Sequence, residues 1–258
     1  MRVGIIGATG WLGSALGKQL LDHGLVAPEN MVLLNRSGPR SEYHGYHGAI
    51  WAHDANDLVA QVDIVVLSVR PYDWPSLNLQ ADGKMVLSFM AGVRAESLLA
   101  CGGRVVRVMP NASADIGRSY SPWWTASSLD ATDRAAITDI LSVIGTSDEL
   151  ASESQIDLMT AVSGSGAAYP ALMATAMARF LLDRGVDETV AWRSAEAVVC
   201  CGAQLLAGRI IDAPALVTTY CNYNGTTAAG LQAAEDAGFS RAILRALEAA
   251  TEKARGMG

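Results

Sequence analysis

The sequence predicts an α/β domain over residues 1–151, followed by an all-helical domain over residues 152–258. In the first part, short apolar segments of strand length alternate with helical patterns, which is typical of a parallel sheet covered by helices. From Glu153 onward, every periodic segment has the spacing of a helix. Half of the 258 residues are hydrophobic and 17% are charged, so the chain can bury one large core or two smaller ones.

The first apolar strand, at residues 3–6, leads into the glycine-rich segment Gly-Ala-Thr-Gly-Trp-Leu-Gly at residues 7–13. A helical pattern and a second strand at residues 31–34 follow. This order predicts the first βαβ unit of a Rossmann-like dinucleotide-binding fold. Glycine at position 7 permits the turn, and glycine at position 10 lets a pyrophosphate approach the helix N-terminus. An ordinary glycine turn is the alternative, which the flanking strands and helix disfavour.

The end of the second strand indicates which dinucleotide binds. NAD enzymes usually place a carboxylate there for the ribose 2′-hydroxyl, but this sequence has Asn35, Arg36 and Ser37. A guanidinium pairs well with a 2′-phosphate. We therefore expect NADP(H) to be preferred over NAD(H). The alternative is that Arg36 is a solvated surface charge.

The remaining elements of the first domain follow in order. We expect strands at residues 49–52, 63–69, 84–88, 104–109 and 120–126, and helices at residues 54–60, 94–100 and 130–144, with a loop at residues 38–48. Three of the strands end near Val69, Met90 and Met109, and each is followed by small or polar residues. Parallel strands bring such ends to one edge of the sheet, where ligands bind.

In the second domain we expect helices at residues 155–162, 167–183, 187–207, 228–236 and 240–254, with a short one starting near residue 212. The segment 167–183 carries only Arg179 as a charge before Asp183. A helix that is apolar nearly all round must be buried on every side, and about a hundred residues cannot do this alone. We therefore expect a partner subunit to cover this helix. Residues 222–227 are predicted to form a polar turn, with Thr226 or Thr227 capping the next helix.

Composition excludes several classes of protein. The net charge of −7 argues against binding to nucleic acid or to an anionic membrane, and no uncharged apolar run reaches membrane-spanning length. Met1-Arg2 leads directly into a core strand, so we expect no N-terminal signal. The cysteines form no C-x-x-C motif and all four histidines precede residue 54, so we expect reduced thiols, a cytoplasmic protein and no metal site.

The catalytic groups of several reductase classes are absent from the sequence. No tyrosine has a lysine four residues later, and no histidine follows residue 53. Reduction of a ketone needs a proton donor, whereas a protonated imine is already electrophilic. A hydride donor, a substrate anchor and one hydroxyl would suffice for the imine, with positioning supplying much of the rate. Thr226 and Thr227 are the first candidates for that hydroxyl, and Ser163 and Ser165 the second; the alternative for the threonines is helix capping.

These features together resemble those of the pyrroline-5-carboxylate reductase family. The segments that carry the resemblance are Arg107–Asn111 (R-V-M-P-N), Asp157–Tyr169 (close to D-x-x-T-A-x-S-G-S-G-P-A-Y, with Ala167 for Pro), Asn224–Gly230 (the end of S-P-G-G-T-T-x-x-G), Val69–Pro71 and Ala91–Val93. They lie in family order and spacing along nearly the whole chain.

The resemblance implies NAD(P)H-dependent reduction of a cyclic imine acid, most commonly 1-pyrroline-5-carboxylate to L-proline. It also implies a helical C-terminal domain that forms homodimers, and larger rings of dimers are common in the family. The cofactor contacts that carry over are Gly7, Ala8, Thr9, Gly10, Trp11, Leu12, Asn35, Arg36, Ser37, Asn56, Val69, Arg70, Pro71, Ala91, Gly92, Met109, Pro110 and Asn111. The hydroxyl near the imine nitrogen falls on Thr227, and the substrate contacts fall on Ser163, Ser165, Asn222, Asn224, Gly225, Thr226 and Thr227.

The sequence departs from the family at the nucleotide loop and at the substrate turn. The family usually has G-x-G-N-[ML] where this chain has Gly-Ala-Thr-Gly-Trp-Leu-Gly at residues 7–13, which places the bulky Trp11 near the pyrophosphate contacts. Its Ser-Pro-Gly is replaced by Asn222-Tyr223-Asn224, so a related cyclic imine could be the substrate. Two other functions remain open: reduction or oxidation of a carbonyl on the same fold, and NADP sensing without turnover.

Overall fold

The computed structural model describes residues 1–257. Contacts divide the chain into two compact units. Unit 1 comprises Met1–Gly166 and the segment that starts at Leu247, and unit 2 comprises Ala167–Ala246. The predicted α/β class for the first part and the all-helical class for the second are both confirmed.

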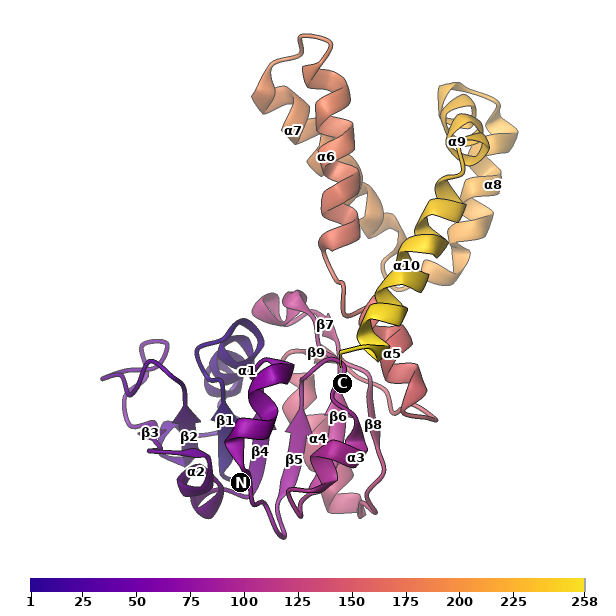
Figure 1. The fold of residues 1–258 in the computed structure, drawn as a ribbon. Coiled ribbons are helices and arrows are strands. Elements are labelled where there is room, and N and C mark those ends of the chain that lie inside the picture. The colour runs from indigo at the N-terminus through magenta and orange to yellow at the C-terminus, as the bar shows by residue number, and fades with distance from the viewer. Residues whose placement is uncertain (258) are drawn as a thin grey trace. The chain divides into compact units, whose positions relative to one another are not determined.

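Unit 1 is built on a seven-stranded sheet with the strand order β3-β2-β1-β4-β5-β6-β8 (Figure 1). The strands are β1 (Val3–Ile6), β2 (Met31–Leu34), β3 (Ile50–Trp51), β4 (Ile64–Leu67), β5 (Met85–Ser88), β6 (Arg104–Val108) and β8 (Trp123–Thr125). All neighbours are parallel except β6 and β8. Val3 of β1 pairs with Met31 on one side and Ile64 on the other, so the strand order reverses at β1.

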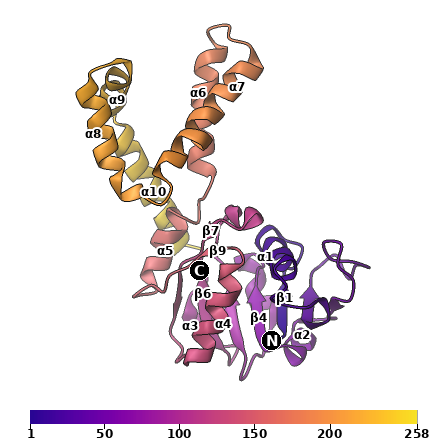
Figure 2. The ribbon, with the colours of Figure 1, turned by 180° about the vertical axis from the view of Figure 1, so that it is seen from behind.

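Helices cover both faces of this sheet (Figures 1 and 2). They are α1 (Trp11–Asp22), α2 (Ala55–Gln61), α3 (Ala95–Leu99), α4 (Ala131–Ser142) and α5 (Ser154–Ala161), with 3-10 turns η1 (Pro28–Asn30), η2 (Pro71–Leu77) and η3 (Ala112–Ile116). Strand residues alternate between two buried clusters: Val66 packs with the side chains of α1 and α4, and Val65 with those of α2 and α3.

The predicted strand at 120–126 is two shorter strands. β7 (Ser119–Tyr120) pairs with β9 (Gly145–Thr146) in a separate two-stranded sheet, and β8 begins only at Trp123. Pro122 lies between them, and proline has no N–H for a central ladder. The chain therefore changes sheets at this residue.

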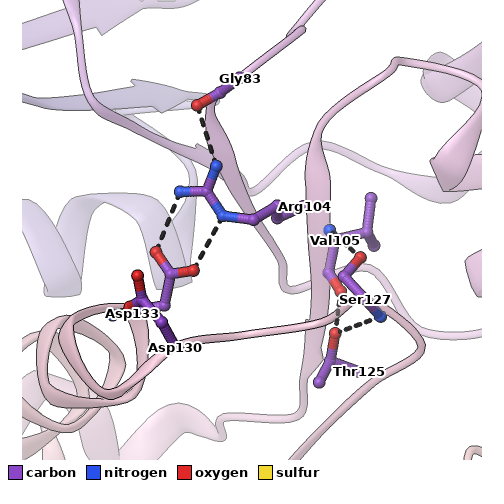
Figure 3. A network of polar contacts seen from close by, with 7 residues as sticks. All are labelled: Gly83, Arg104, Val105, Thr125, Ser127, Asp130 and Asp133. Carbon is purple, nitrogen blue, oxygen red and sulfur yellow. Dashed lines mark hydrogen bonds and ion pairs between the residues drawn. The ribbon is translucent and has the colours of Figure 1, made fainter.

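A polar network ties the edge strand β8 to β6, and β6 to α4 (Figure 3). Thr125 Oγ1 donates to the Val105 carbonyl at 2.6 Å, and Ser127 Oγ accepts the Val105 N–H at 3.0 Å. Arg104 donates to both Asp133 carboxylate oxygens at 2.9 Å. Asp133 lies in the first turn of α4, so this pair ties the sheet to that helix.

A buried ion cluster joins α5 to the sheet. The guanidinium of Arg107 on β6 is 1% exposed and lies 2.8 Å from Glu153, whose carboxylate also accepts the Ala95 N–H at 2.7 Å. Asp157 of α5, also 1% exposed, lies 3.1 Å from Arg94. Burial lowers the pKa of Arg107, while the Glu153 carboxylate opposes this shift. These contacts place α5 in unit 1.

Unit 2 contains α6 (Ala168–Leu182), α7 (Glu188–Glu196), α8 (Ala213–Tyr223), α9 (Thr226–Asp236) and the start of α10 (Phe239–Arg255). The predicted helix at 187–207 is α7 continued by a π-helical segment at Ala197–Cys201 and a 3-10 segment at Gly202–Leu206. Among residues 1–257, no single helix has the length and apolar composition to cross a bilayer; only the bent pair Glu188–Leu206 and Ile210–Tyr223 meets those criteria together.

The turn between α8 and α9 is shorter than predicted. α8 runs through Tyr223, Asn224 adopts the left-handed conformation (φ 54°), and Gly225 is the N-cap of α9. Capping by Thr226 or Thr227 was therefore a wrong prediction. Both threonines lie inside the first turn of α9, because the left-handed Asn224 reverses the chain in two residues.

Candidate active site

The glycine loop, residues 7–13, lies where β1 ends and the strand order reverses. Gly7 has φ +90°, and a Cβ there would lie 2.3 Å from the Ser68 carbonyl oxygen. A Cβ on Gly13 would lie 2.5 Å from the Gly7 oxygen, so glycine is required at both positions. The Gly7 N–H donates to the Leu34 carbonyl at 2.8 Å, which holds the loop against the end of β2. This switch point is where doubly wound sheets bind dinucleotides.

A cavity of about 680 Å³ opens beside the glycine loop. The predicted cofactor residues that line it are Gly7, Thr9, Gly10, Asn35, Arg36, Ser37, Val69 and Arg70. Sequence reasoning missed several others: Ser68, which directly follows β4, His53 and Asp54 before α2, and Asp73 in η2. For Ser68, His53 and Asp54, the position after a strand or before a helix on the same edge is the signal that could have found them; Asp73 carries no such signal.

The residues around this cavity fit a dinucleotide. Gly10 is the N-cap of α1 and has no side chain to cover the N–H groups of the first turn, so these can receive a pyrophosphate. Among residues 1–257, no group accepts a hydrogen bond from the buried Asn35 Nδ2, although Asn35 Oδ1 accepts from Ser37. A buried donor without a partner at the end of β2 suits the adenosine ribose of a ligand.

Charges of both signs meet at the same end of the cavity. The Arg36 guanidinium is 80% exposed and its Nη1 lies 4.0 Å from Asp73 Oδ1. Arg70 donates to the Tyr72 hydroxyl at 2.6 Å, which raises the pKa of that guanidinium. The guanidinium of Arg36 can pair with a phosphate, whereas Asp73 repels one.

The other predicted cofactor residues are distributed along the carboxyl edge of unit 1. Ala8 is buried, Leu12 packs against the core, and Trp11 projects outward with Nε1 donating to Asp115 at 2.7 Å. Asn56 accepts the Gln80 N–H at 3.0 Å, which fixes a neighbouring loop. Pro71 lines a second cavity, together with Tyr72 and Trp74.

The loops after β5 and β6 carry Ala91, Gly92, Met109, Pro110 and Asn111. Gly92 has φ +77°, and a Cβ there would lie 2.5 Å from the Met257 Cβ and 3.0 Å from the Ala254 oxygen. The residues at 254–257 therefore pack directly on this loop. Asn111 caps η3 by accepting the Ser113 N–H at 2.9 Å.

The Ser-Gly-Ser-Gly turn at residues 163–166 reaches the same edge. Ser163 Oγ donates to the Met159 carbonyl at 3.1 Å, and Ser165 Oγ to the Ala161 carbonyl at 2.8 Å. A Cβ on Gly166 would lie 3.3 Å from the Asn111 Cβ. The turn after α5 and the end of β6 are thus in contact, although they are far apart in the sequence.

The remaining predicted substrate residues belong to unit 2. Asn222 lies in the last turn of α8, Asn224 and Gly225 form the reverse turn, and Thr226 and Thr227 open α9. All of these residues except Gly225 are exposed, and Tyr223 beside them is 86% exposed. Together they present hydroxyl and amide groups on one short surface of that unit.

An open, mostly parallel sheet with a glycine loop and a cavity at its switch point defines a dinucleotide-binding Rossmann-type domain. The family described as NADP oxidoreductase, coenzyme F420-dependent, matches residues 2–92, and that described as pyrroline-5-carboxylate reductase dimerisation matches residues 153–257. The chain is 31% identical over 266 residues to pyrroline-5-carboxylate reductase of Methanosarcina acetivorans, covering 100% of this chain and 98% of the other. The chain belongs to the pyrroline-5-carboxylate reductase family.

Other relatives agree. Pyrroline-5-carboxylate reductase 2 of Bacillus subtilis is 28% identical over 256 residues, covering 96% of this chain and 91% of that one. The fold matches the NADP-bound crystal structure of the Plasmodium falciparum pyrroline carboxylate reductase with a TM-score of 0.87 at 23% identity, covering 100% and 98% of the two chains. The Streptococcus pyogenes enzyme has a TM-score of 0.83 at 25% identity, with 99% and 98% covered. The predicted family and the NAD(P)-dependent oxidoreductase class are confirmed.

Proposed function

We propose that the protein reduces 1-pyrroline-5-carboxylate, or a close cyclic imine acid, with NADPH as the hydride donor. Membership of the family over the full length of the chain is the observation that carries this function. The cavity at the switch point supplies the dinucleotide site that it requires. Reduction of the C=N bond of 1-pyrroline-5-carboxylate gives L-proline.

The chemistry needs few protein groups. Bound NADPH would supply a hydride to the carbon of the protonated imine. The π-electron pair of the C=N bond then passes to the nitrogen, which already carries the proton taken up from water and becomes the amine of the product. We assign to the Thr227 hydroxyl the hydrogen bond to the imine nitrogen. The amides and hydroxyls of residues 222–227 are proposed to hold the substrate carboxylate, with Ser163 and Ser165 as further contacts. This positioning supplies much of the rate.

The preference for NADPH over NADH is part of the proposal. Arg36 and Ser37 offer a guanidinium and a hydroxyl at the end of β2, where a 2′-phosphate would lie. The buried Asn35 Nδ2 has no acceptor among residues 1–257. This free donor supports placing the adenosine ribose at the same end of the cavity. The other cofactor residues assigned from the family segments remain predictions.

A homodimer through the helical unit is the proposed assembly. α6 leaves Leu172 70% exposed and Phe180 56% exposed, and an apolar groove of about 1,120 Å³ opens beside Phe180, Met173 and Leu231. A second copy of the chain would remove this surface from water.

Two further predictions remain as they were: a boundary of the cofactor domain after residue 151, and a cytoplasmic location.

The function is tested by following NADPH absorbance with purified protein and 1-pyrroline-5-carboxylate. We expect turnover in the wild type, a loss of at least tenfold in kcat for Thr227→Ala, and partial recovery for Thr227→Ser, which keeps the hydroxyl. Thr226→Ala, which removes a proposed carboxylate contact and keeps the Thr227 hydroxyl, should instead raise KM for the imine with a smaller change in kcat. Bound NADPH without turnover would contradict this substrate and favour another cyclic imine, given Tyr223 in the substrate turn.

A further inference from the structure

The segment Tyr43–Tyr46 forms a closed tight turn in the loop after β2. The Tyr43 N–H donates to the Tyr46 carbonyl at 2.9 Å, and the Tyr46 N–H donates back to the Tyr43 carbonyl at 3.0 Å. The two central residues, His44 and Gly45, have φ of 53° and 82°. Positive φ at both central positions is the geometry of a type I′ turn, which holds the flanking residues in a fixed orientation.

Three side chains attach this turn to α1 and the glycine loop. The Tyr43 hydroxyl donates to the Ala8 carbonyl at 2.7 Å, and its oxygen also lies 3.3 Å from the Gly13 carbonyl. His44 Nε2 lies 3.0 Å from Ser14 Oγ. The Tyr46 hydroxyl donates to Asp22 Oδ1 at 3.0 Å, near the other end of α1.

The Tyr43 phenol is buried against the helix. Tyr43 is 3% exposed, and its ring packs edge-on against Trp51 with centroids 6.1 Å apart. A Cβ on Gly17 would lie 2.3 Å from the Tyr43 hydroxyl oxygen, so the absence of a side chain at position 17 makes room for the phenol. Burial raises the pKa of Tyr43 well above its usual value, so the hydroxyl remains a donor at any physiological pH.

The contact with Ala8 constrains the next amide. A trans peptide is planar, and its C=O and N–H point in opposite directions. Because the Ala8 carbonyl is drawn towards the buried Tyr43 hydroxyl, the N–H of Thr9 is turned the opposite way, and Thr9 lines the dinucleotide cavity. The loop at residues 7–13 departs from the family pattern, so this support belongs to the loop of this chain.

We infer that Tyr43 is a positioning residue for the dinucleotide: its buried hydroxyl orients the glycine loop so that the loop N–H groups face the pyrophosphate. The inference rests on the proposed function only through the binding of NADPH. It assigns a role to a loop residue that lies outside every motif of the family resemblance. Its effect is on affinity for the dinucleotide and not on the transfer of the hydride.

The test compares Tyr43→Phe with Tyr46→Phe by titrating NADPH binding. Tyr43→Phe should raise the Kd for NADPH about 5- to 10-fold, the effect of one buried hydrogen bond, with kcat at saturating NADPH within about twofold of the wild type. Tyr46→Phe removes a hydroxyl from the same turn without touching the glycine loop and should leave Kd unchanged. Adenosine 2′-phosphate, which has no pyrophosphate, should bind both variants like the wild type.

A second variant approaches the same contact from the helix. Gly17→Ala places a methyl group where the Tyr43 hydroxyl lies and should raise the Kd for NADPH by a similar factor. Combining Gly17→Ala with Tyr43→Phe should raise the Kd little further, because both changes remove the same contact. Equal Kd values for wild type and Tyr43→Phe would overturn the inference, as would an equal loss with adenosine 2′-phosphate. A wild type that binds NADPH but reduces no imine contradicts the proposed function alone.

Discussion

Arg104 and Arg107 lie on the same strand, and burial makes their ion pairs very different. The side chain of Arg104, at the amino end of β6, is 38% exposed, whereas that of Arg107, paired with Glu153, is 1% exposed. Exposed pairs contribute up to about 1 kcal/mol, because water already solvates both charges. Removing one member of a buried pair leaves a charge without compensation and costs about 3 kcal/mol or more.

We therefore expect Arg107→Met to lower the free energy of unfolding by about 3 kcal/mol, because Glu153 and Asp157 lose a buried cation. Arg104→Met is the matched control and should cost about 1 kcal/mol. Urea unfolding of the two variants gives both values. Similar losses would show that the cluster around Arg107 is solvated in solution.

Cofactor choice is a second residue-level property. Removing the guanidinium with Arg36→Ala should raise KM for NADPH about tenfold and leave KM for NADH nearly unchanged, because only NADPH carries the 2′-phosphate. Asp73→Asn removes a nearby carboxylate and should lower KM for NADPH. Steady-state kinetics with both cofactors measures the two changes, and parallel shifts for NADH would place Arg36 away from the phosphate.

His44 should make stability depend on pH. Burial lowers its pKa below 6.5, with Lys18 and Arg40 lowering it further and Ser14 and Asp22 raising it. The folded state thus favours the neutral ring. The stability that the neutral ring contributes is fully present above pH 6.5 and is lost as the pH falls through 6.5 towards the lower pKa of the folded state. Between pH 7.5 and 5.5, the wild type should lose more free energy of unfolding than His44→Asn. Asparagine is chosen because it tolerates the positive φ at this position. Equal losses in the two proteins would show that His44 does not cause the pH dependence.

Two helices of unit 1, α2 and α4, each begin at a capping aspartate. The Asp130 carboxylate accepts the Asp133 N–H at 2.8 Å at the start of α4, and Asp54 does the same for α2. Asp130→Ala should cost about 1 kcal/mol, because the first turn loses its acceptor. Asp139→Ala, in the exposed middle of α4, should be neutral or slightly stabilising. Thermal unfolding compares the two variants, and a neutral Asp130→Ala would mean that the cap contributes nothing.

Most elements could be predicted because each has its own periodicity. The run at 63–69 and the cap at Asp54 carry local signals that the structure confirms. Local patterns could not show that β7 pairs with β9, because that pairing joins residues far apart in the sequence. The π-helical segment at Ala197–Cys201 was predicted only as part of one longer helix, because a local sequence pattern does not distinguish i→i+5 from i→i+4 hydrogen bonds over a single turn.

The glycine loop and Asn35–Ser37 were predictable as parts of a site, because glycine spacing and strand ends are sequence properties. Asp73 and Tyr43 were not predictable in this way. Each reaches the site from a loop whose path is set by tertiary contacts, Asp73 towards Arg36 and Tyr43 towards Ala8. The substrate residues around Thr227 rest on the family resemblance and on the proposed chemistry.

Assembly is the prediction at the scale of the whole molecule. Leu172→Arg places a charge on the exposed apolar side of α6 and should shift the protein from dimer towards monomer. Ile116→Arg, equally exposed but on η3 of unit 1, should leave the assembly unchanged. Light scattering at matched concentrations measures the mass, and an unchanged mass for Leu172→Arg would exclude this face of α6 from the interface.

Unit 1 is discontinuous, since residues 167–246 separate its first segment from the one that starts at Leu247. Ribosomes add roughly 5–20 residues per second, so the first segment emerges on the order of ten seconds before the second is made. During that interval the Gly92 loop lacks Ala254 and Met257, which pack on it in the finished protein. The nascent chain therefore carries an incomplete nucleotide-binding unit with an uncovered edge, which is the stage at which a chaperone would protect it.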